Sequence, residues 1–500
     1  MEVLVFSLTK PHTMRLSACL VAAAAAVAPA LASLRGANSW DSVLANWNET
    51  QLLQVADYMA QHLLPFGYDH VVTDEGWYWT GDNEGDASLD AFGRPTPRLD
   101  QYPSAADGHG FRAIADALHA QGLKLGVWSI RGIPKLAAER RMPIFNSSFT
   151  ADEAVTSAAN CSWNNHCFGC APSDDGSSCN DAAWAYFRSV ASWYAQMRVD
   201  LVKIDCMFDQ AYTGTFDRDL VAFTTAFKEI GIAVSLSPGP ISFANGSFIA
   251  QTGLAAQYRV TQDFWDQWGD HGPTSYPTGL RSKLDAALQF APLFGANGTS
   301  PDLDMLPLGY IQSHATQQPH GPVPSALTPD EQATVMSLWA ITGAPLMFGG
   351  RLPLDAADPV DAATLALLTN AAILGVHNGS VSRTPVAPMG GGDPEAAAPP
   401  PPRGGPVAAN VNQTYAWAAL PAARADGSAA YVALFNGDEA AHTVQVRLAD
   451  AGLAPGQLYC AFDLWTGARV PGTVAGSFAA PLRPHQAGVF GLYSSAAAPC

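Results

Sequence analysis

The sequence predicts an α/β fold in which a (β/α)8 barrel, or TIM barrel, is followed by a smaller antiparallel β domain. Short apolar runs alternate with longer amphipathic segments from residue 33 to about residue 383, as expected of strand–helix units around a parallel sheet. A Gly- and Pro-rich stretch then separates this region from short alternating runs, which are typical of antiparallel strands.

Eight strand candidates recur at regular intervals in the first region. One lies near Gly36–Trp40, and the others cover 68–73, 123–129, 201–205, 233–237, 257–261, 302–306 and 345–348. Amphipathic periodicity predicts helices over 49–64, 110–121, 182–197, 216–230, 282–294 and 328–341. Eight strands with helices between them close a barrel, whose functional groups lie at the carboxyl ends of the strands.

Composition divides the rest of the chain. Residues 1–32 contain the apolar stretch Leu16–Ala28 and then Ala30-Leu31-Ala32, a small-residue pattern that predicts a cleaved secretion signal. A membrane anchor is the alternative, but the stretch is shorter than the roughly 20 apolar residues that span a bilayer. The barrel is expected over 33–383, a linker or loop over 384–406, and the C-terminal domain over 407–500, with strands at 414–418, 430–436, 443–448, 457–464 and 487–493.

Charge and sequons indicate the surroundings of the protein. A formal net charge of -18 argues against a nucleic-acid partner, and 48% hydrophobic residues argue against disorder. We expect no membrane association once the signal is removed, and nothing in the sequence marks a subunit interface. Extracellular, cell-wall, vacuolar or lysosome-like locations would all allow N-glycans on some of the seven sequons, at Asn48, Asn146, Asn160, Asn245, Asn297, Asn378 and Asn412.

Cysteines cluster between the third and fourth predicted strands, at Cys161, Cys167, Cys170 and Cys179. In an oxidising compartment this pattern predicts a disulfide-linked loop. Zinc is the alternative, because a histidine lies inside the cluster and Cys-x-x-Cys is a common ligand spacing. Removal of the signal leaves seven cysteines, so at least one thiol stays unpaired, and the partner of Cys206 is left open.

Acidic residues stand where predicted strands stop. Asp74-Glu75 and Asp263 come after two such strands, Asp205 ends a third, and the segment PDLDML supplies Asp302 and Asp304. Asp and Glu are poor strand formers. Lys203 and Asp205 share a strand face, and the cation favours the ionised carboxylate. Carboxylates gathered at a barrel mouth predict a site for a hydroxyl-rich substrate.

The motifs at these strand ends resemble glycoside hydrolase family 27, the α-galactosidase or melibiase family, and more closely a plant-type branch that includes β-L-arabinopyranosidases. The matching segments are GANSW, VVTDEGWYW, GLKLGVWSIRGIP, VDLVKIDCMF, VSLSPGP, YRVTQDFWDQWGD, PDLDMLPLGY and WAITGAPLMFGG. The resemblance implies a barrel followed by a β-sandwich. It implies a retaining exo-glycosidase that releases terminal α-D-galactose from an oligosaccharide or glycan, with no metal or organic cofactor, and β-L-arabinopyranose as the alternative sugar.

By this resemblance, Asp205 matches the nucleophile and Asp263 the general acid/base. Such a cycle needs carboxyl groups about 5 to 5.5 Å apart, with Asp263 protonated and Asp205 ionised in the resting enzyme. The residues implied to line the sugar subsite are Trp40, Asp74, Glu75, Trp128, Lys203, Arg259 and Asp304.

Three positions depart from the family pattern. Most members with α-galactosidase activity carry Asp where this chain has Glu75, near the sugar's C6 group, so the longer side chain could favour a pentose that lacks C6. Ala37 replaces a tryptophan. Cys206 follows the nucleophile directly, which puts the usual disulfide beside the site in doubt.

Other interpretations remain open at this point. Asp205 could be a structural ion-pair partner, Asp263 a helix N-cap, and Asp302/Asp304 a Mg or Mn site. Trp265 and Trp268 suit packing as well as substrate contact. For the whole chain, the rivals to an enzyme are a catalytically idle sugar-binding protein and a structural cell-wall glycoprotein.

Overall fold

A computed structural model describes residues 33–79, 87–161, 164, 166–207, 216–237, 241–269, 278–312, 322–354, 361–389, 413–424 and 429–495. The predicted signal at 1–32 and most of the predicted linker lie outside these residues. No helix in the described ranges is long and apolar enough to cross a membrane.

Eight parallel strands form the predicted barrel, in the order β10-β9-β8-β7-β3-β2-β1-β13. A parallel bridge between Leu306, just after β10, and Phe348 of β13 brings the two ends of this sheet together. The strands are β1 (Arg35–Asn38), β2 (His70–Thr73), β3 (Lys124–Ile130), β7 (Leu201–Asp205), β8 (Ala233–Leu236), β9 (Gln257–Arg259), β10 (Ser300–Asp302) and β13 (Leu346–Phe348). The fold prediction is therefore confirmed, with the seventh strand beginning two residues earlier than expected.

Helices surround the sheet, and six of them, α2, α3, α5, α6, α8 and α9, fall on the predicted segments. They are α1 (Trp40–Val43), α2 (Glu49–His62), α3 (Arg112–Ala120), α5 (Asp181–Gln196), α6 (Phe216–Lys228), α7 (Phe243–Thr252), α8 (Leu280–Phe290), α9 (Pro329–Thr342), α10 (Ala362–Leu368) and α11 (Ala371–Gly379). Capping boxes begin α2 at Asn48 and α9 at Thr328, which explains their sharp starts. Helix α7 was not predicted, because Asn245 and Gly246 weaken its helical pattern.

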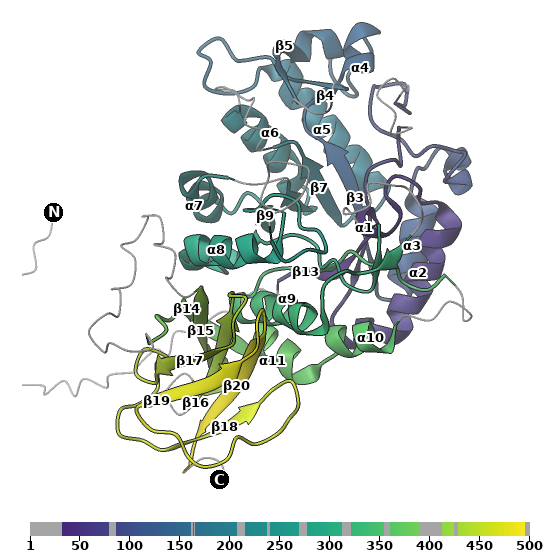
Figure 1. Ribbon diagram of the computed structural model, residues 1–500. Helices are drawn as coiled ribbons and strands as arrows, with labels where there is room; N and C mark the ends of the chain where they lie inside the picture. The colour runs from purple at the N-terminus through teal and green to yellow at the C-terminus, as the bar shows by residue number, and fades with distance from the viewer. Residues whose placement is uncertain are drawn as a thin grey trace, which may run out of the picture.

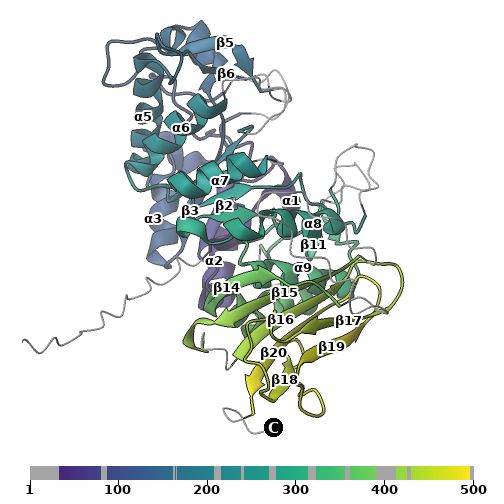
Figure 2. The ribbon, with the colours of Figure 1, turned by 90° about the vertical axis from the view of Figure 1, so that its left-hand side faces the viewer.

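An excursion between β3 and α5 carries the cysteine cluster. It contains β4 (Ile133–Pro134), α4 (Lys135–Glu139), β5 (Val155–Asn160) and β6 (Cys167–Cys170), with the strands in a three-stranded sheet. In both views it lies at the opposite end of the molecule from the C-terminal domain (Figures 1 and 2).

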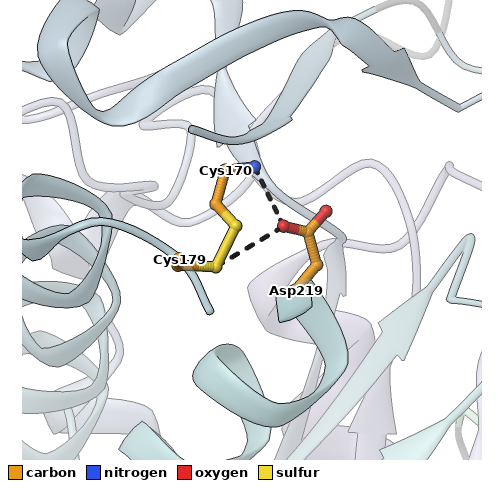
Figure 3. A group of neighbouring side chains, drawn as sticks. All are labelled: Cys170, Cys179 and Asp219. Atoms are coloured by element: carbon orange, nitrogen blue, oxygen red, sulfur yellow. Dashed lines mark hydrogen bonds between the residues drawn. A yellow bond between two sulfur atoms is a disulfide. The ribbon is translucent and has the colours of Figure 1, made fainter. Parts of the chain in front are cut away.

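Disulfides rather than zinc organise this excursion. Cys170 is bonded to Cys179, and Asp219 accepts a hydrogen bond from the Cys170 N–H at 2.9 Å (Figure 3). Cys206 is bonded to Cys161, and Cys460 of the C-terminal domain is disulfide-bonded as well. Cys167 keeps a free, buried thiol. The zinc alternative is wrong for the described cysteines, because a disulfide leaves no thiolate for a metal.

The C-terminal domain contains two antiparallel sheets. One has the order β14-β15-β16-β20-β18, the other pairs β17 with β19, and side chains from both form one apolar core. The strands are β14 (Ser380–Pro385), β15 (Thr414–Pro421), β16 (Ala429–Asn436), β17 (His442–Arg447), β18 (Tyr459–Asp463), β19 (Ser477–Leu482) and β20 (Ala487–Ser494). The boundary predicted at residue 383 falls inside β14, and α9 lies against this domain (Figure 1).

Gly36 in β1 tests the packing of the barrel wall. A Cβ at this position would lie 2.2 Å from the backbone oxygen of His70 on β2, so Gly36→Ala forces two strands apart. We expect a loss of about 1–3 kcal/mol in the free energy of unfolding, measured by urea denaturation. The control is Gly375→Ala in α11, where nothing lies within 4 Å and alanine should be neutral or stabilising by about 0.5–1 kcal/mol. Equal effects of the two substitutions would contradict this account.

Candidate active site

The predicted polar residues gather towards the carboxyl ends of five of the six consecutive strands from β2 to β10 in the sheet. Asp74 and Glu75 follow β2, Trp128 lies on β3, and Asp205 ends β7. Arg259 ends β9, and Asp304 lies two residues beyond β10. Because parallel strands end at the same edge of the barrel, hydrogen bonds and charge interactions link these side chains into one network.

Asp74 and Lys203 form the first buried pair of this network. The Lys203 Nζ donates to Asp74 Oδ2 at 2.7 Å, and Asn38 Nδ2 donates to the same oxygen at 2.7 Å. Burial acts to lower the pKa of Lys203, but the Asp74 and Asp205 carboxylates raise it by more than burial lowers it. The net pKa is therefore above the ordinary value. Lys203 therefore remains a cation among carboxylates.

Asp205 is held by two donors at the end of β7. Trp128 Nε1 donates to Oδ2 at 3.0 Å, and the Cys206 N–H donates to Oδ1 at 2.9 Å. Cys206 adopts a left-handed backbone conformation, with φ of 62°, and its disulfide to Cys161 fixes the chain beside the carboxylate. The disulfide put in doubt by the sequence is thus present. The prediction that a cation shares the face of Asp205 is also consistent with the charge interaction between Lys203 and this carboxylate.

Asp263 and Asp304 share the second buried cation. The Arg259 guanidinium donates to Asp263 Oδ1 at 2.6 Å and to Asp304 Oδ1 at 2.9 Å. Asp304 is buried, whereas the Asp263 side chain is 62% exposed, so solvent partly screens the outer ion pair. The N-cap of the following helix, α8, is Gly279, so the interpretation of Asp263 as a helix N-cap is wrong.

The pKa values of the two aspartates shift in opposite directions. Burial raises the pKa of Asp205 above its ordinary value, despite the opposing effects of Lys203 and Trp128. Burial also acts to raise the pKa of Asp263, but the charge and hydrogen bond of Arg259 prevail and lower it. These shifts run against the expectation of a protonated Asp263 beside an ionised Asp205, which stays a prediction, because sequence spacing did not reveal the direct contact between Asp263 and Arg259.

Glu75 has a different environment from its neighbour Asp74. It is half-buried, and its Oε1 accepts a hydrogen bond from Trp79 Nε1 at 3.2 Å. Burial, with repulsion from Asp205 and Asp74, raises the pKa of Glu75 to about 7. Near neutral pH its carboxyl group can therefore accept or donate a hydrogen bond.

The tryptophans divide into buried and half-buried groups. Trp128 is fully buried against Tyr78 and Trp79, and it reaches the site through its Nε1, which donates to Asp205. Trp40 is half-buried at the start of α1. Trp268 stacks on a histidine of the C-terminal domain, in agreement with the packing interpretation.

The Asp302/Asp304 pair is occupied by protein donors. Asp302 Oδ1 accepts the Asp304 N–H at 2.8 Å, and Asp304 accepts from Arg259 and from the Phe264 N–H. Asp302 thus orients the loop that carries Asp304. N–H donors directed at these oxygens do not fit the Mg or Mn alternative, since a cation needs the same lone pairs.

Four residues of the network were not predicted. Asn38 and Ser39 hold Asp74 through hydrogen bonds of 2.7 and 3.0 Å, and Trp79 holds Glu75. Asp41 is buried with one oxygen lacking a hydrogen-bond partner, and burial and nearby carboxylates raise its pKa well above the ordinary value. Their proximity to Trp40 and Asp74 in the sequence was the available signal.

Comparison with known proteins places this geometry in context. A family described as "Alpha galactosidase C-terminal beta sandwich domain" matches residues 414–492, which confirms the predicted sandwich. The crystal structure of a family 27 β-L-arabinopyranosidase from Geobacillus stearothermophilus is 31% identical, with a TM-score of 0.78, and the alignment covers 93% of this chain and 96% of that chain. An α-galactosidase from Cyamopsis tetragonoloba is 23% identical over 457 residues, covering 90% of this chain and 83% of the relative. Alpha-galactosidase 2 from Arabidopsis thaliana is 24% identical over 356 residues, covering 70% of this chain and 67% of the relative.

Lys203→Met tests the buried charge network. The substitution leaves Asp74 buried without its cation, so we expect a loss of about 3 kcal/mol or more in the free energy of unfolding by urea denaturation. Lys124→Met is the matched control, because Lys124 pairs with Asp69 at the same 2.7 Å but is 47% exposed. The control should lose no more than about 1 kcal/mol. A Lys203→Met variant as stable as the control would contradict the network.

Proposed function

The chain belongs to glycoside hydrolase family 27 and is a glycosidase, and we propose that it releases non-reducing terminal α-D-galactose with retention of anomeric configuration. The observation that carries the proposal is the pair of acids on neighbouring charge clusters, Asp205 with Lys203 and Asp263 with Arg259. A protein that only binds sugar, or only builds a wall, has no chemical need for two such acids.

In the first step, an oxygen of Asp205 attacks the anomeric carbon and the bond to the leaving oxygen breaks. Asp263 gives its proton to that leaving oxygen, so the products are a covalent glycosyl-enzyme and a neutral alcohol. Trp128 Nε1 and the Cys206 N–H donate hydrogen bonds to Asp205 and orient its two oxygens. Both donors are neutral, so they tolerate the loss of the carboxylate's negative charge when the ester forms.

In the second step, Asp263 removes a proton from water, and the water oxygen displaces Asp205 from the sugar. Arg259 assists this half, since its contact favours the ionised form of Asp263. The same contact opposes the first half, which needs the proton. The first half therefore requires bound substrate to offset the effect of Arg259 and to raise the pKa of Asp263.

The remaining side chains suit recognition of a galactose-like ring. Asp74, with its Asn38 and Lys203 partners, offers paired acceptors and donors for vicinal hydroxyl groups. Glu75 is the residue that we assign to the region of C6. Trp40 supplies a half-buried aromatic surface at the start of α1.

A second substrate, β-L-arabinopyranoside, is favoured by one observation. Glu75 is one methylene longer than the aspartate typical of α-galactosidases, and L-arabinopyranose is the galactose ring without C6. The arabinopyranosidase that is 31% identical to this chain supports the same alternative. The two substrates share one mechanism, so the choice depends on the space around Glu75.

We also propose that the protein is secreted or delivered to a vacuole-like compartment. The disulfides support this, because such bonds persist mainly where conditions are oxidising. The secretion signal remains a prediction from the sequence.

Azide rescue tests the roles of the two aspartates on p-nitrophenyl α-D-galactopyranoside. Alanine at either position should lower kcat by about 10²-fold or more. With azide, Asp263→Ala should yield the α-galactosyl azide, because azide then replaces water on the glycosyl-enzyme. Asp205→Ala should yield the β-azide, because azide then replaces the nucleophile on the opposite face. The anomers are assigned by NMR, and the opposite pairing, or unchanged turnover in either variant, would contradict the assignment.

Glu75→Asp tests sugar preference. We expect the ratio of kcat/KM for p-nitrophenyl α-D-galactopyranoside to that for the β-L-arabinopyranoside to rise about 5- to 150-fold, because the shorter acid makes room for C6. Trp79→Phe is a control that keeps the length of Glu75 but removes its hydrogen bond. A ratio that stays constant in Glu75→Asp would show that this residue does not select the sugar.

A further inference from the structure

We propose that His485, from the C-terminal domain, is a positioning residue for the general acid/base Asp263. The inference rests on the proposed function, since it concerns the segment 262–268 that carries the acid. It gives the C-terminal domain a part in the reaction of the barrel.

His485 stacks on the indole of Trp268, which lies five residues after Asp263. The ring centroids are 3.8 Å apart and the planes differ by 11°. The histidine lies in the turn between β19 and β20, with φ of 60°, and the Trp268 loop follows β9 of the barrel. One domain thus contacts the loop that presents the other domain's acid.

Barrel and C-terminal groups also fix the histidine ring. Its Nδ1 lies 2.7 Å from Glu331 Oε1 on α9, and its Nε2 lies 3.1 Å from Glu439 Oε1 in the turn after β16. Thr334 Oγ1 of α9 donates to the His485 carbonyl at 2.7 Å. The residue is therefore held by hydrogen bonds at Nδ1 and at its backbone carbonyl, so the ring can act as a fixed support for Trp268.

Helix α8 transmits the position of Trp268 to Asp263. The Trp268 carbonyl accepts the Arg281 N–H in the first turn of α8, and Lys283 Nζ from the next turn donates to the Asp263 carbonyl at 3.3 Å. A Cβ on Gly279 would lie 2.5 Å from the Trp268 oxygen, so the two segments cross without spare room. A shift of Trp268 therefore presses on the helix that holds the backbone of Asp263.

The side chain of Asp263 depends on this backbone support. It is 62% exposed, and among the residues that the structure describes its side chain is hydrogen-bonded to the guanidinium of Arg259. A displacement of the loop by an ångström or less misplaces the proton donor while leaving Asp205 on its strand. Loss of the histidine ring should thus weaken acid catalysis selectively.

The test compares two leaving groups in wild type and His485→Asn. Asparagine tolerates positive φ but lacks the ring. Methyl α-D-galactoside needs protonation to leave, whereas 2,4-dinitrophenyl α-D-galactoside does not, and kcat/KM reports the step that forms the glycosyl-enzyme. We expect kcat/KM to fall about tenfold on the methyl glycoside and less than about twofold on the dinitrophenyl glycoside.

Two further variants keep the test decisive. Arg483→Gln breaks the neighbouring contact between the domains, the Arg483–Asp330 pair, without touching Trp268, and should change kcat/KM less than about twofold on either substrate. If His485→Asn does not fold, Trp268→Leu replaces it, with the same expected selectivity. Equal losses on both substrates, or no loss, in the variant tested would overturn the proposal.

Asp263→Ala separates this inference from the proposed function. It should lose at least about 10²-fold on the methyl glycoside and far less on the dinitrophenyl glycoside. If it does, and the histidine variant shows no selectivity, only the positioning role of His485 is wrong. If Asp263→Ala itself shows no selectivity, the acid/base assignment fails and the positioning proposal fails with it.

Discussion

Two buried cations, Lys203 and Arg259, hold together a site that would otherwise consist of mutually repelling carboxylates. Lys203 binds Asp74 and lies within reach of the charge of Asp205, and Arg259 joins Asp263 to Asp304. Removal of one partner from such a buried pair typically costs about 3–5 kcal/mol, because the remaining charge is left without compensation. The positions of both cations follow from the barrel, since Arg259 ends β9 and Lys203 lies on β7 two residues before its end, near the edge where the strands deliver acids.

The backbone of the site is strained at two residues next to these ion pairs. Cys206 and Asp304 both have positive φ, at 62° and 96°, and each stands beside a functional carboxylate. Such conformations persist where surrounding contacts over-determine them. Here the Cys161–Cys206 disulfide supplies that restraint on one side, and the bonds of Asp304 to Arg259 and to the Phe264 N–H supply it on the other. Charge pairing and backbone geometry thus depend on each other.

Strand-end acids and apolar runs were sufficient to predict the barrel and the gathering of Asp74, Asp205 and Asp304, because parallel strands carry their ends to one edge. The same signals could not predict the lowered pKa of Asp263. The shift depends on a 2.6 Å contact with Arg259 at the end of β9. Asp263 lies four residues later on a loop, and the hydrophobic pattern of the sequence does not encode the direction of that loop. Helix α7 escaped notice because its pattern is weak. The fully buried state of Trp128 depends on packing by Tyr78 and Trp79, which only the folded structure brings together.

The central claim is that Asp205 forms a covalent bond to the sugar. The most direct test is peptide mass spectrometry of enzyme treated with 5-fluoro-α-D-galactosyl fluoride, a substrate whose glycosyl-enzyme turns over slowly. We expect one added fluorogalactosyl group, located on Asp205 in the peptide that contains LVKIDC. A label on another residue, or complete hydrolysis of the reagent without any labelled peptide on rapid quenching, would contradict it.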